Sequence, residues 1–187
     1  MKKSVIFVMS VLIFGGSIMC AGCSTEDPLA KKVIDELQER RVSKHSYLEL
    51  DTDDKVYYIE KAINENDADK IYDIFSEDVK QEVGEDELLA RIKEWMSAFN
   101  GSASLTYMWS SENSSTDNDL YDAEDDVAFN YVVNDTEYVC VITAVDASSK
   151  STDYVGARYM LSIKRELLDA GEYTFTDYDT PGVATID

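Results

Sequence analysis

Cysteine, proline, histidine and basic side chains are all scarce in this chain of 187 residues. It has three cysteines, two prolines and one histidine, and its 17 lysines and arginines face 38 aspartates and glutamates. So little proline excludes collagen-like and proline-rich classes. A formal charge of -21 repels phosphate backbones, so we expect no nucleic acid among the partners. Hydrophobic residues make up 44% of the chain and aromatic residues 11%, which is enough to build a core.

The first 23 residues have the layout of an export signal, with two lysines ahead of an apolar run over residues 5–18. The segment Met19-Cys20-Ala21-Gly22-Cys23 resembles a bacterial lipobox, except that Cys20 stands where leucine is usual. We therefore predict a signal peptide at residues 1–22 and an acylated Cys23. Two acyl chains on this cysteine would hold the protein in the lipid bilayer, on the extracytoplasmic face of the cell membrane. The alternative is an uncleaved anchor, because the apolar run could almost span a bilayer.

The cysteine count follows from this prediction. Cys20 leaves with the signal peptide and Cys23 carries lipid, so Cys140 remains alone and forms no intrachain disulfide. Cys140 lies in a strand-like apolar run, where a free thiol behaves as a small buried hydrophobe. The single histidine, His45, lies in a predicted tether over residues 23–50, so no obvious base is available to activate Cys140.

Helical periodicity begins at residue 51. Asp51 can cap a helix that runs to about Asn64, and Asp67 can cap a second helix that ends near residues 76–78. A third helix is predicted from about Glu85 to Asn100, with its apolar residues on one side. Three helices therefore open the predicted domain of residues 51–187.

After residue 100 the apolar period changes from about 3.6 to 2, which is typical of strands. We predict strands over residues 105–109, 127–133, 136–145 and 155–163, with Asn134-Asp135 as a hairpin turn. Tyr173 and Phe175 alternate in a further predicted strand, ahead of a tail at residues 181–182. Residues 110–126 are expected to form a long acidic loop. Helices followed by strands predict an α+β fold, with N-terminal helices packed on a curved antiparallel sheet.

Two groups of motifs in the predicted domain resemble known families. The opening two helices resemble those of the nuclear-transport-factor-2-like superfamily in the runs Ile59-Glu60-Lys61-Ala62-Ile63, Asp67, Lys70-Ile71 and Ile74-Phe75-Ser76-Glu77-Asp78-Val79. A family of secreted Gram-positive lipoproteins with no assigned activity is similar in Phe99-Asn100-Gly101, residues 146–153, Val155-Gly156, Tyr159-Met160-Leu161 and Thr180-Pro181-Gly182-Val183. The resemblance implies a cone-shaped domain whose curved sheet wraps helices and encloses a cavity. It implies no catalytic residues.

Five aromatic residues are candidates to line such a cavity: Trp95, Tyr107, Trp109, Tyr131 and Tyr159. The other interpretation is that these rings fill the core. A buried tyrosine needs a partner for its hydroxyl, which favours a cavity that is polar or hydrated in part.

Related cones include isomerases and dehydratases that use a His-Asp or Tyr-Asp pair inside the cavity. The domain has no histidine, which removes the commonest acid-base residue at neutral pH. The predicted strand faces place no carboxylate beside the inward tyrosines. An open cavity with a carboxylate next to a tyrosine hydroxyl would favour an enzyme, and a closed aromatic core would oppose it.

The chain shows no metal or cofactor motif. The acidic run of residues 117–126 fails the EF-hand spacing, because Tyr121 and Asp122 occupy its fifth and sixth positions. We therefore predict no metal site, no cofactor and no catalytic residues. A calcium-responsive surface module built on this acidic run is a third possibility. The expected function is that of a membrane-anchored, non-catalytic binding module for a partner protein or a small-molecule solute. The alternative is a cavity enzyme of the isomerase or dehydratase type.

Overall fold

The computed structural model describes residues 28–117, 120–175 and 180–187. The chain divides into two units, residues 1–36 and 37–187. Of the first unit, only the start of helix α1 (Pro28–Val42) is described. No helix within the described ranges is both long and apolar enough to cross a bilayer.

Four α-helices precede the sheet in residues 43–105, all of which are described: α2 (Thr52–Asn64), α3 (Ala68–Ile74), α4 (Glu77–Val83) and α5 (Glu85–Ser97). The two predicted caps are confirmed. The Asp51 side chain accepts a hydrogen bond from the backbone N–H of Asp54, and the Asp67 side chain accepts one from the backbone N–H of Lys70. Helix α4 is an addition to the three predicted helices. It has only two valines, too few to produce a helical period, and Gly84 at φ 88° separates it from α5.

Packing in the second unit starts before residue 51. A short 3-10 helix, η1 (Tyr47–Glu49), follows α1, and both Tyr47 and Leu50 are buried. Arg41 pairs with the buried carboxylate of Asp54 at 2.5 Å. The last part of the predicted tether therefore belongs to the packed unit.

The sheet has five strands in the order β1 (Thr106–Asp117), β2 (Leu120–Val133), β3 (Thr136–Ser148), β4 (Gly156–Lys164) and β5 (Gly182–Ile186). The first four pair antiparallel and β5 pairs parallel with β4. The α+β class is confirmed, but the expectation of a wholly antiparallel sheet is wrong. A parallel partner needs a crossover, which helix α6 (Arg165–Asp169) begins. Tyr173 lies in no strand, and the predicted tail forms β5 instead.

The predicted acidic loop is also wrong, because β1 and β2 pair through most of residues 110–126. This part of the hairpin is held by polar side chains. Ser111 donates to Asp126 at 3.0 Å, and Ser148 of β3 donates to Asp122 at 2.6 Å. A search for apolar alternation misses such a strand. The Asn134-Asp135 turn is confirmed, with φ of 49° and 62° at its two residues.

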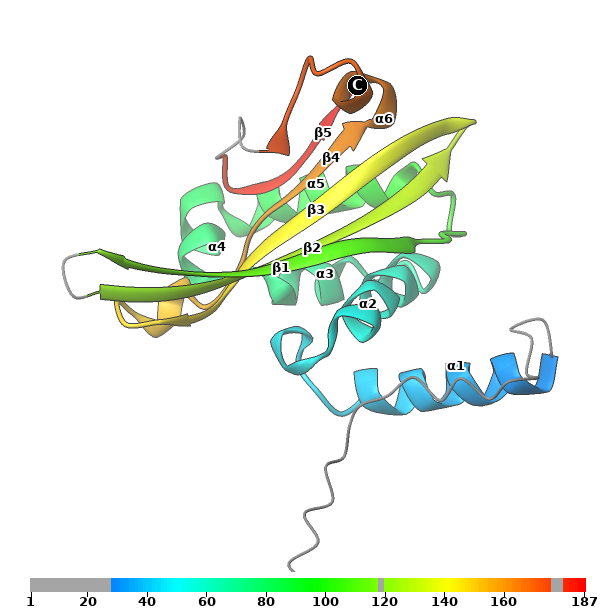
Figure 1. Ribbon diagram of the computed structural model, residues 1–187, viewed down its shortest axis with the longest axis horizontal. Helices are drawn as coiled ribbons and strands as arrows, with labels where there is room; N and C mark the ends of the chain where they lie inside the picture. The colour runs from blue at the N-terminus through cyan, green and yellow to red at the C-terminus, as the bar shows by residue number, and fades with distance from the viewer. Residues whose placement is uncertain (1–27, 118–119, 176–179) are drawn as a thin grey trace, which may run out of the picture. The chain divides into compact units, whose positions relative to one another are not determined.

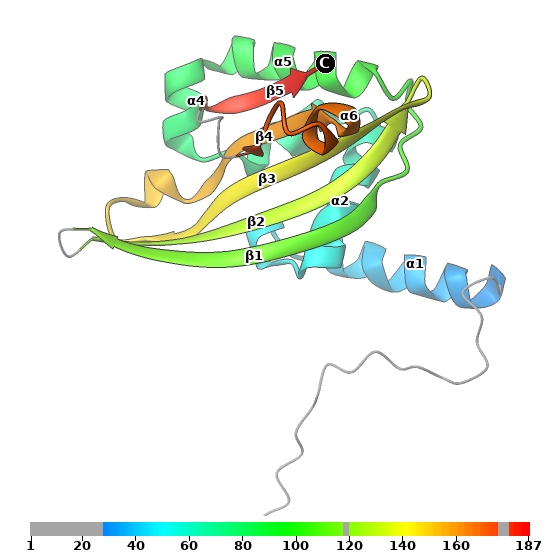
Figure 2. The same cartoon turned by 45° about the horizontal axis from the view of Figure 1, so that its top comes forward.

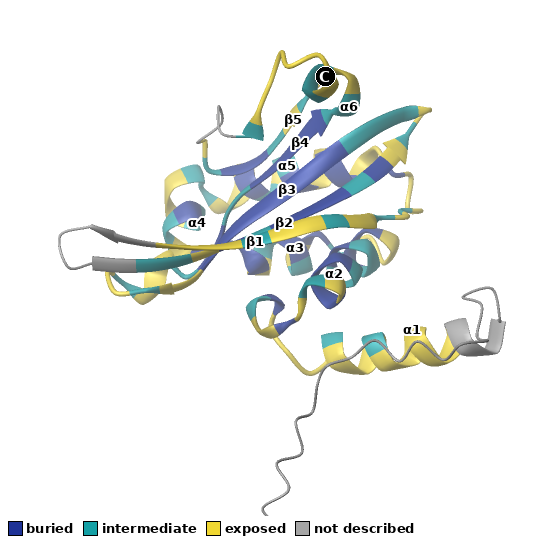
Figure 3. Ribbon diagram, viewed as in Figure 1, coloured by how far each residue is buried: buried dark blue, intermediate teal, exposed yellow. Residues whose placement is uncertain are grey.

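Helices α2 to α5 lie together on one face of the sheet (Figures 1 and 2). The core lies between them, and the buried residues follow β2, β3 and β4 and the inner sides of the helices (Figure 3). Its largest fully buried side chains include Phe129, Ile59, Leu88, Ile92 and Met160. Helix α5 runs beside β5, and this pairing creates the pocket described next.

Candidate functional site

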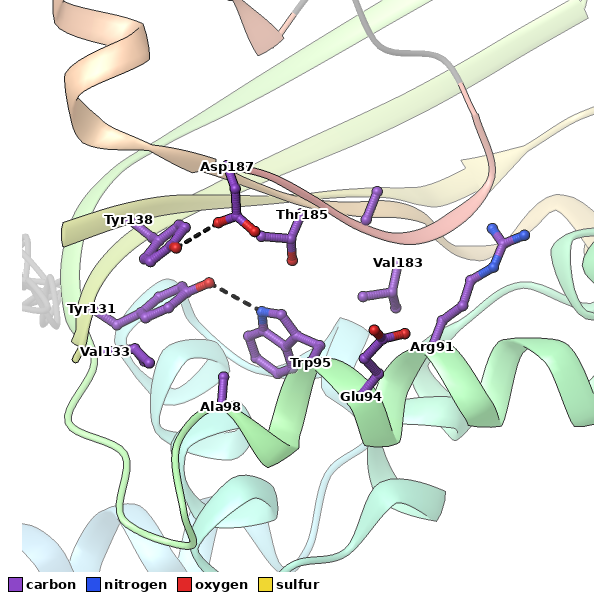
Figure 4. Close-up of a pocket in the computed structure, with 11 residues that line it drawn as sticks. Arg91, Glu94, Trp95, Ala98, Tyr131, Val133, Tyr138, Val183, Thr185 and Asp187 are labelled. Atoms are coloured by element: carbon purple, nitrogen blue, oxygen red, sulfur yellow. Dashed lines mark hydrogen bonds between the residues drawn. The ribbon is translucent and has the colours of Figure 1, made fainter. Parts of the chain in front are cut away.

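A pocket opens between helix α5 and the edge strand β5, beside the ends of β2 and β3 (Figure 4). Its volume is about 370 Å³, within the range of small-molecule sites. The residues that line it are Arg91, Glu94, Trp95, Ala98, Tyr131, Val133, Tyr138, Val183, Ala184, Thr185 and Asp187.

Strand pairing explains why residues from four strands meet here. Tyr131 of β2 pairs directly with Tyr138 of β3, and Ser162 of β4 pairs with Thr185 of β5. Cys140 of β3 pairs with Ser162 and lies two residues from Tyr138. Directly paired residues share a face of the sheet, and so do residues two apart in one strand. All five side chains therefore lie on the face that packs against α5.

Trp95 reaches the pocket from α5. This helix buries Leu88, Ile92, Trp95 and Met96, which recur at the spacing of one helix face. The Trp95 Nε1–H donates to the Tyr131 hydroxyl at 3.2 Å and to Ser162 Oγ at 3.1 Å. The shared donor fixes the indole ring against β2 and β4 and satisfies its buried N–H.

The aromatic rings of the pocket hold one another in place. Tyr131 and Tyr138 are stacked, with centroids 5.3 Å apart and ring planes 12° apart. Trp95 meets Tyr131 edge to face at 6.2 Å, and Phe99 packs on Tyr131 at 4.8 Å. Tyr131 and Trp95 are only 4% and 5% exposed. Rings packed in this way cannot rotate freely, so this wall of the pocket is formed before any ligand arrives.

Two phenols of the pocket, Tyr131 and Tyr138, and the nearby thiol of Cys140 are held in their neutral forms. Burial raises the pKa of the Tyr131 phenol well above its ordinary value. Burial and the hydrogen bond to Asp187 raise the pKa of Tyr138 to about 12, and burial raises the pKa of the Cys140 thiol to about 12. These groups are neutral at physiological pH, so they can take part in hydrogen bonds but cannot act as anionic nucleophiles.

Charged side chains stand at the pocket's rim. The Tyr138 hydroxyl donates to Asp187 Oδ1 at 2.5 Å. Glu94 is exposed on α5 and forms no salt bridge with any residue in the described ranges. Arg91 Nε donates to Glu87, one turn earlier on α5, at 2.8 Å. Figure 4 draws Asp187 and Thr185 on the β5 side of the pocket and Trp95 and Glu94 on the α5 side.

Only two of the five predicted lining residues, Trp95 and Tyr131, line the pocket. Tyr107 and Trp109 lie on β1, at 40% and 39% exposure. A bulge at Met108 breaks the strict alternation that put them on one face. Tyr159 pairs with Thr143, in register with the outer face of the sheet, so it points away from the helices.

Sequence reasoning missed Tyr138, Asp187 and Glu94 as pocket residues. Tyr138 could have been found, because a two-residue turn at Asn134-Asp135 sets the register that places it opposite Tyr131. Asp187 could not have been found, since the strand that carries it was not predicted. Glu94 gives no pattern signal, because an exposed acid on a helix is ordinary.

The remaining site predictions have different outcomes. Cys23 and the signal peptide lie outside the described residues, so the lipid anchor stays a prediction. His45 lies 3.8 Å from Glu49, far in sequence from Cys140, which is a buried free thiol. Within the described ranges, no three His, Cys, Asp or Glu side chains are grouped as metal ligands would be.

The fold and the pocket together define an α+β domain with a preformed aromatic cavity at the edge of its sheet. No family model matches the chain, and no curated protein is significantly similar to it.

Proposed function

We propose that the protein is a lipoprotein anchored through acylated Cys23 on the extracytoplasmic face of the membrane, and that its domain binds a small solute without catalysis. The observation that carries the binding function is the pocket between α5 and β5. It has a suitable volume, rigid aromatic walls and polar groups at its rim. The neutral phenols of Tyr131 and Tyr138 favour binding over nucleophilic chemistry.

We also propose that the domain is a cone of the nuclear-transport-factor-2-like kind. The order of its elements supports this assignment, since helices α2 to α5 precede a twisted sheet and cover one face of it. The position of the pocket, on the face that the helices cover, also agrees with such a cone. The parallel β5 is a departure from the antiparallel sheet that the resemblance implies.

The lipid anchor is supported by the apolar run at residues 5–18 and the small residues before Cys23. It is tested by metabolic labelling with an alkyne fatty acid. We expect the wild-type protein and the Cys20→Ala variant to be labelled and Cys23→Ala to be unlabelled. Unchanged labelling of Cys23→Ala would refute the assignment.

The binding function is tested by native mass spectrometry of the full chain purified from its own membrane. We expect a non-covalent adduct of small mass on the wild-type protein. Ala98→Phe places a ring in the pocket and should abolish the adduct. Ala90→Phe makes the same change at an exposed position of α5 outside the pocket and should retain it. An adduct that survives Ala98→Phe would show that the pocket is not the site.

One observation favours the alternative of an isomerase or dehydratase. The Tyr138 hydroxyl and the Asp187 carboxylate lie together in the pocket, as an acid-base pair would. The Tyr138 hydroxyl already donates its hydrogen bond to Asp187, so it is not free to act on a substrate. Binding is therefore the better-supported function. Deuterium exchange at the α-carbon of acetophenone, followed by NMR, separates the two. An enzyme would accelerate exchange and lose the effect in Tyr138→Phe, whereas a binding module would not exceed the buffer rate.

A further inference from the structure

The charge on the lining residues of the pocket is unbalanced. Glu94 on α5 and Asp187 after β5 are both carboxylates at the rim. Arg91 is the one cation among the lining residues in the described ranges, and its Nε is bound to Glu87, which is not a lining residue. Part of its positive charge is therefore compensated outside the cavity. The carboxylate of Glu94 has no such partner, so the pocket presents excess negative charge to a ligand.

The walls of the pocket add to this preference. Trp95, Tyr131 and Tyr138 supply an aromatic wall, and the face of an aromatic ring attracts positive charge. Val183 and Ala98 add apolar surface to the lining. A ligand that matches both features has a positive head and an apolar or ring-bearing body.

We infer that the pocket binds a small organic cation, an ammonium group on an apolar or aromatic body. This inference rests on the proposed binding function of the same pocket and names its ligand class. The ammonium group lies near the carboxylates of Glu94 and Asp187, and the body packs against the aromatic wall around Trp95. An anionic solute would meet two carboxylates of its own sign at the rim and be repelled by them.

The net charge of the protein acts in the same direction. A formal charge of -21 draws cations toward the surface and lowers the local concentration of anions. This field by itself does not select a pocket. It raises the rate at which a cation reaches the rim, where the two carboxylates then hold it.

Three probes of similar size and different charge test the inference. They are phenethylamine, which is protonated at pH 7, the neutral 2-phenylethanol and the anionic phenylacetate. The protein is the full chain in a non-ionic detergent with Trp109→Phe, so that Trp95 is the only indole and its fluorescence reports on the pocket. We expect saturable quenching by phenethylamine, about tenfold weaker binding of 2-phenylethanol and no measurable binding of phenylacetate.

Two matched variants locate the charge that matters. Glu94→Gln should weaken phenethylamine binding by about 3- to 10-fold and leave 2-phenylethanol binding unchanged, because only the cation uses the carboxylate. Glu82→Gln removes the same charge from an exposed position of α4 outside the pocket and should change neither affinity. Sodium chloride at 1 M should reduce phenethylamine binding and leave that of 2-phenylethanol unchanged.

The outcomes separate this inference from the proposed function. Equal or tighter binding of the neutral or anionic probe would overturn the inference and leave the pocket as a binding site for another class of solute. Equal effects of Glu94→Gln and Glu82→Gln would also overturn it, because the preference would then come from net charge alone. If none of the three probes quenches the fluorescence, the inference is overturned. The native mass spectrometry of the wild-type protein and Ala98→Phe then decides separately whether the pocket binds any solute.

Discussion

A buried ion pair between α2 and β2 gives the sharpest prediction about stability. Lys55 Nζ lies 2.5 Å from Asp125 Oδ2, and the two side chains are only 5% and 9% exposed. The ammonium group also lies 5.5 Å from the centre of the Tyr47 ring. Water is almost excluded, so each charge depends mainly on the other, and Lys55 also interacts electrostatically with the carboxylate of Asp146. Replacing Lys55 with methionine keeps an unbranched apolar stem, one atom shorter than lysine, but leaves the buried carboxylate of Asp125 without its ion-pair partner.

We expect Lys55→Met to lower the free energy of unfolding by about 3–5 kcal/mol, the usual cost of an unpaired buried charge. This is a large part of the stability of a domain of this size, about 5–15 kcal/mol. Asp125→Leu should cost a similar amount, because it strands the ammonium group. The double variant should lie within about 1 kcal/mol of the wild type, since it buries apolar groups where the pair was.

The assay is urea unfolding followed by circular dichroism, with the four proteins compared at one pH and salt concentration. The double-mutant cycle then gives the coupling between the two side chains. A loss of less than about 1 kcal/mol for both single variants would refute the burial argument, because an exposed pair behaves in this way. So would a double variant whose loss equals the sum of the two single losses.

Three further predictions concern single positions. Gly156→Ala should lower the free energy of unfolding, measured by urea titration, by about 2–4 kcal/mol, because the new Cβ would lie 2.6 Å from the Ser76 amide nitrogen. The control Gly171→Ala places its Cβ near no other atom and should cost about 1 kcal/mol. In a chain whose other cysteines are replaced by alanine, Cys140 should resist iodoacetamide at pH 8 until urea unfolds the protein, since burial raises its thiol pKa to about 12; rapid native labelling would contradict its burial. Folding raises the pKa of Tyr138 from 10.0 to about 12, so stability should hold below pH 10 and fall between pH 10 and 12 as the unfolded phenol ionises. Unfolding midpoints at pH 9, 10 and 11 should show a smaller fall in Tyr138→Phe, and an equal fall would count against the raised pKa.

The parts of the fold that apolar periodicity controls were predictable from sequence. Helices α2 and α5 and the inner residues of β2 and β3 follow simple periods of 3.6 and 2. The long hairpin of β1 and β2 was not predictable in this way, because polar contacts such as that between Ser111 and Asp126 stabilise it. Strand β5 was missed because it is short and pairs with β4 only after a crossover.

Apolar periodicity also decides which residues of the candidate site could be predicted from the sequence. Trp95 and Tyr131 lie on apolar faces whose direction the period gives. Tyr107 and Trp109 follow the same alternation in the sequence, but a β-bulge between them changes the direction of the side chains. Methionine at position 108 is not a residue type that predicts a bulge. Asp187 enters the pocket through tertiary pairing alone, which one sequence cannot reveal.

Fluorine NMR on the full chain labelled with 5-fluorotryptophan tests solute binding at the pocket most directly. Trp95 lies in the pocket and Trp109 lies on β1 outside it, so each variant that replaces one of them with phenylalanine assigns the resonance of the other. The titrant is the small-molecule fraction released when protein purified from its native cells is denatured. We predict that this fraction shifts the Trp95 resonance in a saturable way and leaves Trp109 unmoved. No shift of either resonance, or equal shifts of both, would contradict a binding site between α5 and β5.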